Sequence, residues 1–312
     1  MADDVDEVYD LVAGRLLSGK VIPLLGAGAN LGGRPPDVGY QRGRYLPSGR
    51  ELAEELARSV SYPSADVLDL ARVSQYVTAR LGESSLYDEL HEVFDADYPP
   101  NLLHYFLARL ARHIRQAAAI RECMLIVTVN YDDSLERAFR GIGEPYDLVT
   151  YIGAGIDRGL FRHIPFDGEP SVIRLPNEYT DLPLGERTVI AKIHGAVDRH
   201  NSVDSFVITE DDYVDYITRA DIAQLFPITL AEKVKRSHFL FLGYSLRDWN
   251  FRVMLYRLQR AGTKRKSWAI EAHPNPVDRL TWDMRGVDIL PVRVEDFVAT
   301  MERRLPIPEL LP

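Results

Sequence analysis

The sequence predicts an α/β protein built on a doubly wound, Rossmann-like parallel sheet. Short apolar runs typical of strands alternate with helical patterns along the chain, as they do when helices cover both faces of a sheet. The runs 124–127 and 239–242 are apolar at every position, which indicates central strands buried on both faces. Strands are expected at residues 21–25, 124–129, 188–193, 205–208, 238–243, 267–271 and 287–292.

Helical patterns fill the long interval between the first two expected strands. The sequence Ser48-x-x-Glu51 is a capping box, and apolar residues on one helical face follow it. Further helices are expected at 65–81, 85–94 and 101–117. We interpret residues 62–120 as a helical module inserted into a single domain that spans residues 1–312.

Residues 153–187 are rich in Gly, Pro and Arg and show little periodicity, so we expect a loop that lies over a cleft. The chain ends with PIPELLP after a helix expected at 294–305. This proline-rich end is compatible with a linker, which leaves open whether the chain is part of a longer protein.

Composition limits the classes of function. Hydrophobic and charged residues make up 46% and 27% of the 312 residues, as in ordinary globular proteins. The net charge of −9 argues against a nucleic-acid-binding surface. Cys123 is the only cysteine, which excludes an intramolecular disulfide and a cysteine-rich zinc site. The N-terminus lacks a signal-peptide pattern and no apolar run reaches membrane-spanning length, so we expect a cytoplasmic protein.

A glycine turn follows the first expected strand, in the sequence KVIPLLGAGAN. Missing side chains at Gly26 and Gly28 would let the backbone turn tightly and approach a ligand, with Ala27 between them and Asn30 after them. A helix that begins after such a turn offers free N–H groups to a phosphate. The GxGxxG spacing is only approximate, and an ordinary strand-to-loop turn remains the alternative.

Polar residues follow two more expected strands. Asn130, Asp132 and Asp133 come after 124–129, where ligands of α/β sheets bind, although helix capping would also explain an Asn or Asp there. His194 ends the next strand and precedes a glycine. Its imidazole can exchange a proton near neutral pH, which suits a general base.

The C-terminal half supplies the remaining candidates. Gly243, Ser245 and Asp248 follow the strand at 238–243, and Asp248 is as well explained by helix capping. Glu271 ends the strand SWAIE, where dinucleotide-binding folds often place an acid for the adenosine ribose.

The motifs GAGAN, TVNYD, KIHG and GYSLRDWN, in this order, resemble the sirtuin-like family of NAD-consuming proteins, over about residues 20–295. The resemblance implies that Asn130 lies near the nicotinamide ribose, that Asp132 recognises the carboxamide and that His194 is the catalytic histidine.

The same resemblance implies the residues of an NAD-binding surface. It places the Gly26–Gly28 turn at the pyrophosphate and matches Gly243 and Ser245 to a later dinucleotide-binding turn. Asn30, Asp248 and Glu271 are further candidates for contact with the dinucleotide. NAD is therefore the expected substrate, with no metal ion.

Three departures separate the chain from the protein deacylases of that family. One cysteine cannot build their CxxC…CxxC zinc module, their GIPxFR segment is replaced by residues 45–52, and Val129 stands where they carry Gln. What remains resembles bacterial sirtuin-like NAD hydrolases that deplete NAD during phage infection. In those proteins the domain is often fused to, or partnered with, a sensor or an ATPase.

The leading hypothesis is an NAD glycohydrolase that is held in check until a partner or a change in assembly activates it. An NAD- or ADP-ribose-binding sensor is the alternative, and a protein deacylase is a weaker one. Whether the product is hydrolysed or cyclised stays open. We expect homo-oligomers gated by 62–120 and 153–187, because apolar residues in the first segment exceed one core-facing stripe. Simple packing of that segment across the sheet is the alternative. The residues concerned are Leu102, Leu103, Phe106, Leu107 and Leu110.

Overall fold

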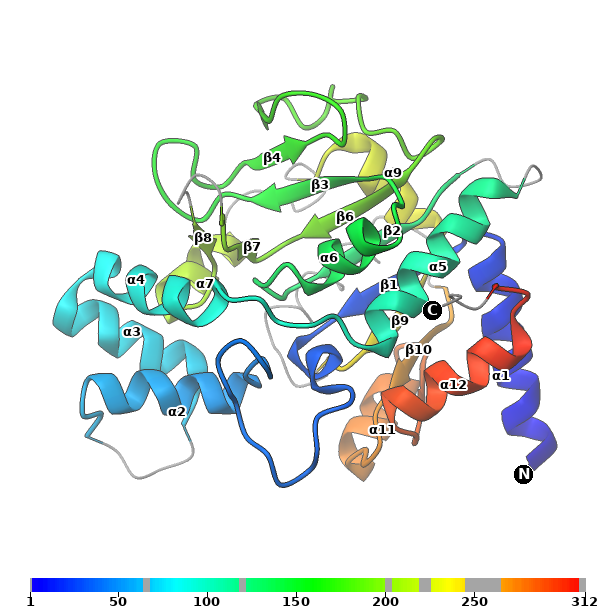
Figure 1. Cartoon of the computed structure of the whole chain (residues 1–312), viewed down its shortest axis with the longest axis horizontal. Coiled ribbons are helices and arrows are strands. Elements are labelled where there is room, and N and C mark those ends of the chain that lie inside the picture. The colour runs from blue at the N-terminus through cyan, green and yellow to red at the C-terminus, as the bar shows by residue number, and fades with distance from the viewer. Residues whose placement is uncertain are drawn as a thin grey trace.

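A nine-stranded, mostly parallel sheet with helices on both faces confirms the expected α/β fold (Figure 1). The computed structural model describes residues 2–63, 68–117, 122–199, 204–218, 226–244 and 265–308. In the order β11-β10-β9-β1-β2-β6-β3-β4-β5, the strands from β11 to β3 pair in parallel, and β4 and β5 are antiparallel. The strands are β1 (Val21–Leu25), β2 (Leu125–Thr128), β3 (Tyr146–Tyr151), β4 (Phe161–Ile164), β5 (Ser171–Ile173), β6 (Thr188–Lys192), β9 (His238–Leu242), β10 (Ser267–Ile270) and β11 (Val287–Leu290).

Helices cover the two faces of the sheet because side chains alternate along each strand. In β1, Ile22 and Leu24 join the core shared with α7, α9 and α11, whereas Val21 and Leu25 join the core shared with α1, α5, α6 and α12. The described helices are α1 (Ala2–Leu17), η1 (Ala27–Leu31), α2 (Gly49–Ser59), α3 (Leu70–Leu81), α4 (Glu83–Phe94), α5 (Leu102–Gln116), α6 (Ser134–Gly141), α7 (Glu210–Thr218), α9 (Ile228–Arg236), α11 (Pro276–Asp283) and α12 (Val294–Arg304). Among these helices, none is both long and apolar enough to cross a membrane.

Several strands differ from the sequence prediction. β3 was not expected, and β4 and β5 lie inside 153–187, which is therefore not a continuous loop. These strands extend the sheet at the edge next to β6. The expected strand at 205–208 is reduced to β8 (Ser205–Phe206), which pairs with β7 (Gly195–Ala196) in a separate small sheet.

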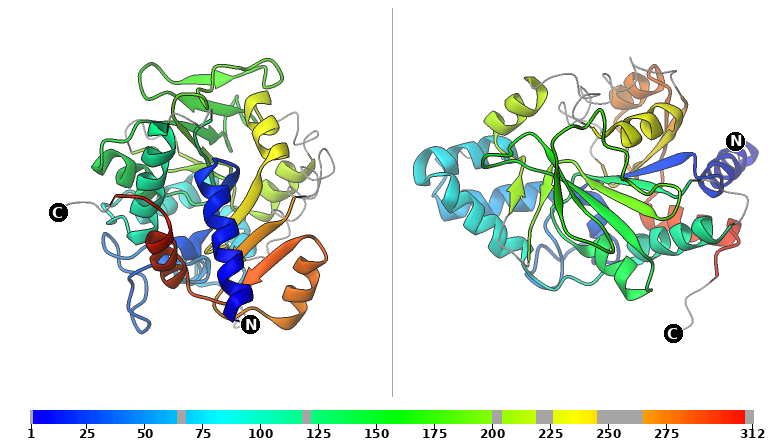
Figure 2. Two further views of the ribbon diagram at one scale, coloured as in Figure 1. Left: turned by 90° about the vertical axis from the view of Figure 1, so that its right-hand side faces the viewer. Right: turned by 90° about the horizontal axis from the view of Figure 1, so that it is seen from above.

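The helices between β1 and β2 divide differently from the expected 62–120. α2, α3 and α4 pack around a core of their own and stand beyond the carboxyl ends of the parallel strands (Figures 1 and 2). By contrast, α5 packs against α6 and α12 and covers the sheet. Its apolar side chains are buried in that core, apart from Leu102, which is 64% exposed. Packing across the sheet thus accounts for the wide apolar stripe, and the argument for self-association loses its basis.

The register of the central strands brings their carboxyl ends into one row. Leu25 of β1 is aligned with Thr128 of β2 and Leu242 of β9, and Thr128 is in turn aligned with Lys192 of β6. From β1 the chain continues to β2 on one side, and it later returns to β9 on the other. The carboxyl end of β1 is consequently the switch point at which α/β sheets bind ligands.

Candidate active site

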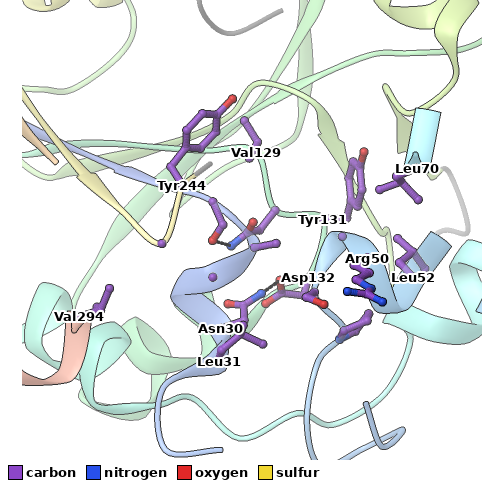
Figure 3. Close-up of a pocket in the computed structure, with 18 of the residues that line it drawn as sticks. Asn30, Leu31, Arg50, Leu52, Leu70, Val129, Tyr131, Asp132, Tyr244 and Val294 are labelled. Atoms are coloured by element: carbon purple, nitrogen blue, oxygen red, sulfur yellow. Dashed lines mark hydrogen bonds between the residues drawn. The ribbon is translucent and has the colours of Figure 1, made fainter. Parts of the chain in front are cut away.

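A cavity of about 680 Å³ opens at this switch point (Figure 3). Its wall contains nine of the residues singled out from the sequence: Gly26, Ala27, Gly28, Asn30, Asn130, Asp132, His194, Gly243 and Glu271. Ser245 and Asp248 lie outside the described residues. No residue of 153–187 lines this cavity, and the expectation that this segment lies over the cleft stays a prediction. The size falls within the range of small-molecule and cofactor sites, about 300–1,000 Å³.

The glycine turns after β1 and β9 pack directly on each other. Gly28 N donates to Gly243 O at 2.8 Å, and Gly26 N donates to Leu242 O at 3.1 Å. A Cβ on Gly26 or Gly28 would lie 2.7 Å from Gly243 O. Glycine is thus required here for contact between two turns, whereas the sequence suggested only close approach to a ligand.

The segment after the first glycine turn is shorter than expected. η1 is a 3-10 helix of five residues that begins at Ala27. Its N-cap residue is Gly26, which has no side chain that could cap the helix. Short 3-10 helices align few peptide dipoles. The helix-dipole argument for a phosphate at this turn is correspondingly weaker than the sequence indicated.

Asn130 is fixed by two hydrogen bonds. Its backbone N–H donates to Thr128 Oγ1 at 3.0 Å, and its side-chain Nδ2 donates to Gly26 O at 3.0 Å. Because a carbonyl oxygen can only accept, this second bond sets which way the amide is turned. The amide oxygen Oδ1 is then the atom that can accept a hydrogen bond from a ligand in the cavity.

His194 lies two residues beyond β6, at the same offset that separates Asn130 from the end of β2. Adjacent strands are about 4.8 Å apart, so the register brings the two residues to neighbouring positions. The imidazole is 3% exposed, and its ring centroid lies 5.6 Å from that of Tyr213 and 5.8 Å from that of Tyr216, both edge-on. The aromatic rings fix the orientation of the histidine.

Asp132 is buried, and both of its carboxylate oxygens accept hydrogen bonds within the protein. Asn30 Nδ2 donates to Oδ2 at 2.7 Å (Figure 3), and Ser134 N donates to Oδ1 at 3.0 Å. Each carboxylate oxygen can still accept a second bond. Asn30 Oδ1 is buried, and no described residue donates to it, which leaves a second acceptor in the cavity wall.

Helices α2 and α3 supply the opposite wall of the cavity, with Arg50 and Leu52 from α2 and Leu70 from α3 (Figure 3). The expected capping box is confirmed, since Ser48 Oγ accepts from Glu51 N and Glu51 Oε2 accepts from Ser48 N. Burial would raise the pKa of the Glu51 carboxyl, but its hydrogen bonds to Ser48 and Arg34 outweigh that effect and lower it. The ionised Glu51 therefore holds the start of α2 against the cavity.

A family model described as the SIR2-like domain matches residues 124–290, more than half of the chain. The chain belongs to the SIR2-like domain family. The matched segment of this SIR2-like chain contains Asn130, Asp132 and His194, whereas the Gly26–Gly28 turn lies outside it.

A solved structure described under "Structural Basis for the Mechanism and Regulation of Sir2 Enzymes" is 17% identical to this SIR2-like chain. The similarity covers 96% of this chain and 97% of that one, with a TM-score of 0.41. This likeness is too low to bear on function. None of the curated proteins compared with the chain matches it.

Beneath the cavity lies a group of buried charges that we did not predict from the sequence. Lys192 Nζ donates to Glu136 Oε1 at 2.8 Å and also to the backbone oxygen of Asp132. Burial raises the pKa of Glu136, and the ion pair with Lys192 opposes that rise. Burial also lowers the pKa of nearby His104 to about 4, so this histidine is neutral at pH 7. A lysine inside the otherwise apolar run VIAKI was the available signal, because a buried cation requires a partner.

Proposed function

We propose that this SIR2-like chain is an NAD glycohydrolase, which cleaves the nicotinamide–ribose bond to give nicotinamide and ADP-ribose. The observation that carries the proposal is the pairing of Asn130 and His194. They follow adjacent parallel strands at equal offsets and line one cavity with the two glycine turns. A module that only bound NAD would not need both an oriented amide and an imidazole at that position.

The side chains of Asn130 and His194 can provide the groups that this cleavage reaction needs. Cleavage of the nicotinamide–ribose bond develops positive, oxocarbenium-like charge on the ribose, as in other glycosidic cleavages. The amide oxygen of Asn130 would accept a hydrogen bond from water or from a ribose hydroxyl and so hold it in one orientation. The imidazole of His194 would take the proton from that same group as the new C–O bond forms.

From the sequence resemblance, Gly26–Gly28 would border the pyrophosphate, Asp132 would meet the carboxamide, and Gly243 would belong to a second dinucleotide-binding turn. Asn30 is a further candidate for contact with the dinucleotide, and Glu271 would meet the adenosine ribose, as an acid at this position of dinucleotide-binding folds often does. Ser245 and Asp248 belong to the same proposed surface. NAD is the proposed substrate, and no metal is proposed, since a single cysteine excludes the zinc module of deacylases.

The proposed biological role is that of a cytoplasmic effector that depletes NAD in antiviral defence. A partner or assembly would activate it. It is supported by the resemblance to bacterial sirtuin-like NAD hydrolases. Light scattering combined with an NAD assay over a range of protein concentrations tests the part played by assembly. A strict monomer with the same specific activity at all concentrations would argue against it.

Nicotinamide release from NAD by the purified chain tests the catalytic proposal. We expect Asn130→Ala and His194→Ala each to lower the rate by about a hundredfold or more, in the range of lost general-base catalysis. Circular dichroism and NAD binding, measured on the same samples, separate lost chemistry from lost structure. His238→Ala is the matched control, because His238 is also buried but lies at the opposite end of β9. Wild-type rates in both folded site variants would refute the assignment.

The same assay separates the alternative functions. Tight NAD or ADP-ribose binding without nicotinamide release would indicate a sensor. Release that depends on an acetylated peptide would indicate a deacylase. Activity that is lost on treatment with a chelator and restored by zinc would contradict the expectation that no metal takes part.

A further inference from the structure

The connection between β3 and β4, residues 152–160, contacts the helix whose side chains face His194. Ile152 and Ala154 of this connection line a second cavity, of about 420 Å³, and not the first cavity at the switch point. Arg158 nevertheless binds α7, a helix that packs against α3 (Figure 1) and carries ring contacts to the histidine. The connection therefore reaches the proposed active site through a helix.

Arg158 forms ion pairs with two carboxylates of α7. Its Nη2 donates to Asp212 Oδ1 at 3.1 Å, and its Nε donates to Asp215 Oδ2 at 3.0 Å. The two aspartates are three residues apart, so they lie on the same face of the helix and repel each other. Four of the nine residues of α7 are acidic and none is basic. The guanidinium therefore supplies the positive charge that α7 itself lacks.

The same helix packs two tyrosine rings on His194. Tyr213 and Tyr216 each directly follow one of the two aspartates that Arg158 binds. Their ring centroids lie 5.6 Å and 5.8 Å from that of the imidazole, and both contacts are edge-on. Tyr213 also lines the first cavity. A displacement of α7 would thus move both rings that orient the imidazole.

A second connection to the histidine runs through the backbone that precedes α7. Asp212 Oδ2 accepts hydrogen bonds from Ile208 N at 3.3 Å and from Thr209 N at 3.0 Å. Val207, the residue before them, donates its N–H to the backbone oxygen of His194 at 2.9 Å. Asp212 consequently binds the guanidinium with one carboxylate oxygen and, with the other, the segment that holds the backbone of the histidine.

We propose that Arg158 is a positioning residue, which holds α7 where this helix fixes the imidazole of His194 against the substrate. The proposal rests on the proposed function, in which His194 is the general base. Arg158 does not line the first cavity, so it would act through α7 and not on the substrate itself. Its loss would leave Asp212 and Asp215 without their shared cation, and the helix would move away from its present position. A displacement of about 1 Å at a reacting group can cost about a hundredfold in rate.

NMR spectra of the chain with its histidines isotope-labelled at Cε1 report the surroundings of the imidazole without any need for catalysis. The signal of His194, one of eight histidines, is assigned by its loss in His194→Gln. We expect Arg158→Met to shift this signal because the neighbouring tyrosine rings move. Arg158→Lys keeps the charge and should shift it less. Arg174→Met is the matched control, since Arg174 pairs with Asp157 of the same connection and not, among the described residues, with α7.

Nicotinamide release measured on the same variants tests the effect on the reaction. We expect the kcat of Arg158→Met to fall by about tenfold to a hundredfold, with little change in its affinity for NAD. Arg158→Lys should recover part of that loss, and Arg174→Met should match the wild type. A general loss of structure would instead lower NAD binding together with the rate.

The proposal is overturned if folded Arg158→Met keeps the wild-type His194 signal, or if the signal shifts while an active enzyme keeps its kcat. Equal effects of Arg174→Met would also overturn it. If Arg158→Met does not fold, Asp215→Asn replaces it, because Asp215 is partly exposed, and a wild-type signal in that variant has the same meaning. A wild-type chain that binds NAD but releases no nicotinamide would refute the proposed function alone, and the His194 signal would still test the position of the imidazole.

Discussion

Replacing Gly243 with alanine should separate the two glycine turns that form the floor of the first cavity. Gly243 has a φ of +60°, in the left-handed region that alanine adopts at a cost of about 1 kcal/mol. In addition, a Cβ at this position would lie 2.0 Å from Ala29 N and 2.3 Å from Gly28 C. Both contacts are with backbone, so no side-chain rotation relieves them and the turns must move apart.

Gly33 offers a matched control for the backbone term. Its φ is +79°, and a Cβ there would meet nothing within 4 Å. Gly33→Ala should therefore cost only the conformational term of about 1 kcal/mol. Gly243→Ala should cost a further 1–3 kcal/mol or so for overpacking, about 2–4 kcal/mol in all.

Urea unfolding monitored by circular dichroism measures both variants, and NAD binding provides the functional readout. We expect Gly243→Ala to lose NAD binding because the floor of the cavity moves, while Gly33→Ala retains it. If the two substitutions lowered the free energy of unfolding equally and both preserved NAD binding, the contact between the turns would not hold the cavity together.

Two further predictions concern the buried charges. Lys192→Met should destabilise the fold by about 3 kcal/mol or more because it leaves the Glu136 carboxylate buried without a cation, and adding Glu136→Leu should recover much of that loss. Arg58→Met, which breaks an exposed pair with Glu55, should change stability by less than about 1 kcal/mol. If urea unfolding showed that Lys192→Met and Arg58→Met lower the free energy of unfolding equally, this reasoning would be contradicted. Burial lowers the pKa of His104 from 6.5 to about 4. As the pH falls below 6.5, His104 becomes protonated in the unfolded chain, whereas in the folded chain it stays neutral until about pH 4. Stability should fall across that interval by up to about 3 kcal/mol more in the wild type than in His104→Gln, and parallel pH profiles of the two would refute this.

The central strands and the residues at their ends could be predicted from the sequence because both signals are local. An apolar run such as 239–242 marks a buried strand, and the polar or glycine residue that follows it marks the carboxyl end. Asn130, His194 and Gly243 were found in this way, and the parallel register then brought them to one cavity. The last two strands of the sheet, β4 and β5, were missed because they are short and include polar side chains, so their apolar pattern is weak.

The partners of buried polar groups could not be predicted, because they depend on contacts between distant segments. Gly243 contacts a turn more than two hundred residues earlier in the chain, and the sequence showed a flexible residue but not the neighbour that requires it. The same holds for α5, whose wide apolar stripe predicted a surface for self-association until its contacts with the sheet, α6 and α12 were known.

Lys192 shows how one such contact reaches the wall of the first cavity. Its ammonium group donates to the Asp132 backbone oxygen, in the wall of the first cavity, and to the Glu136 carboxylate of α6. Glu136 Oε1 is held by the lysine, while Oε2 has no partner among the described residues. Because one ammonium group holds both partners, removing it would leave the Asp132 backbone oxygen and the Glu136 carboxylate without their donor at the same time, so the substitution that lowers stability would also disturb the wall of the first cavity.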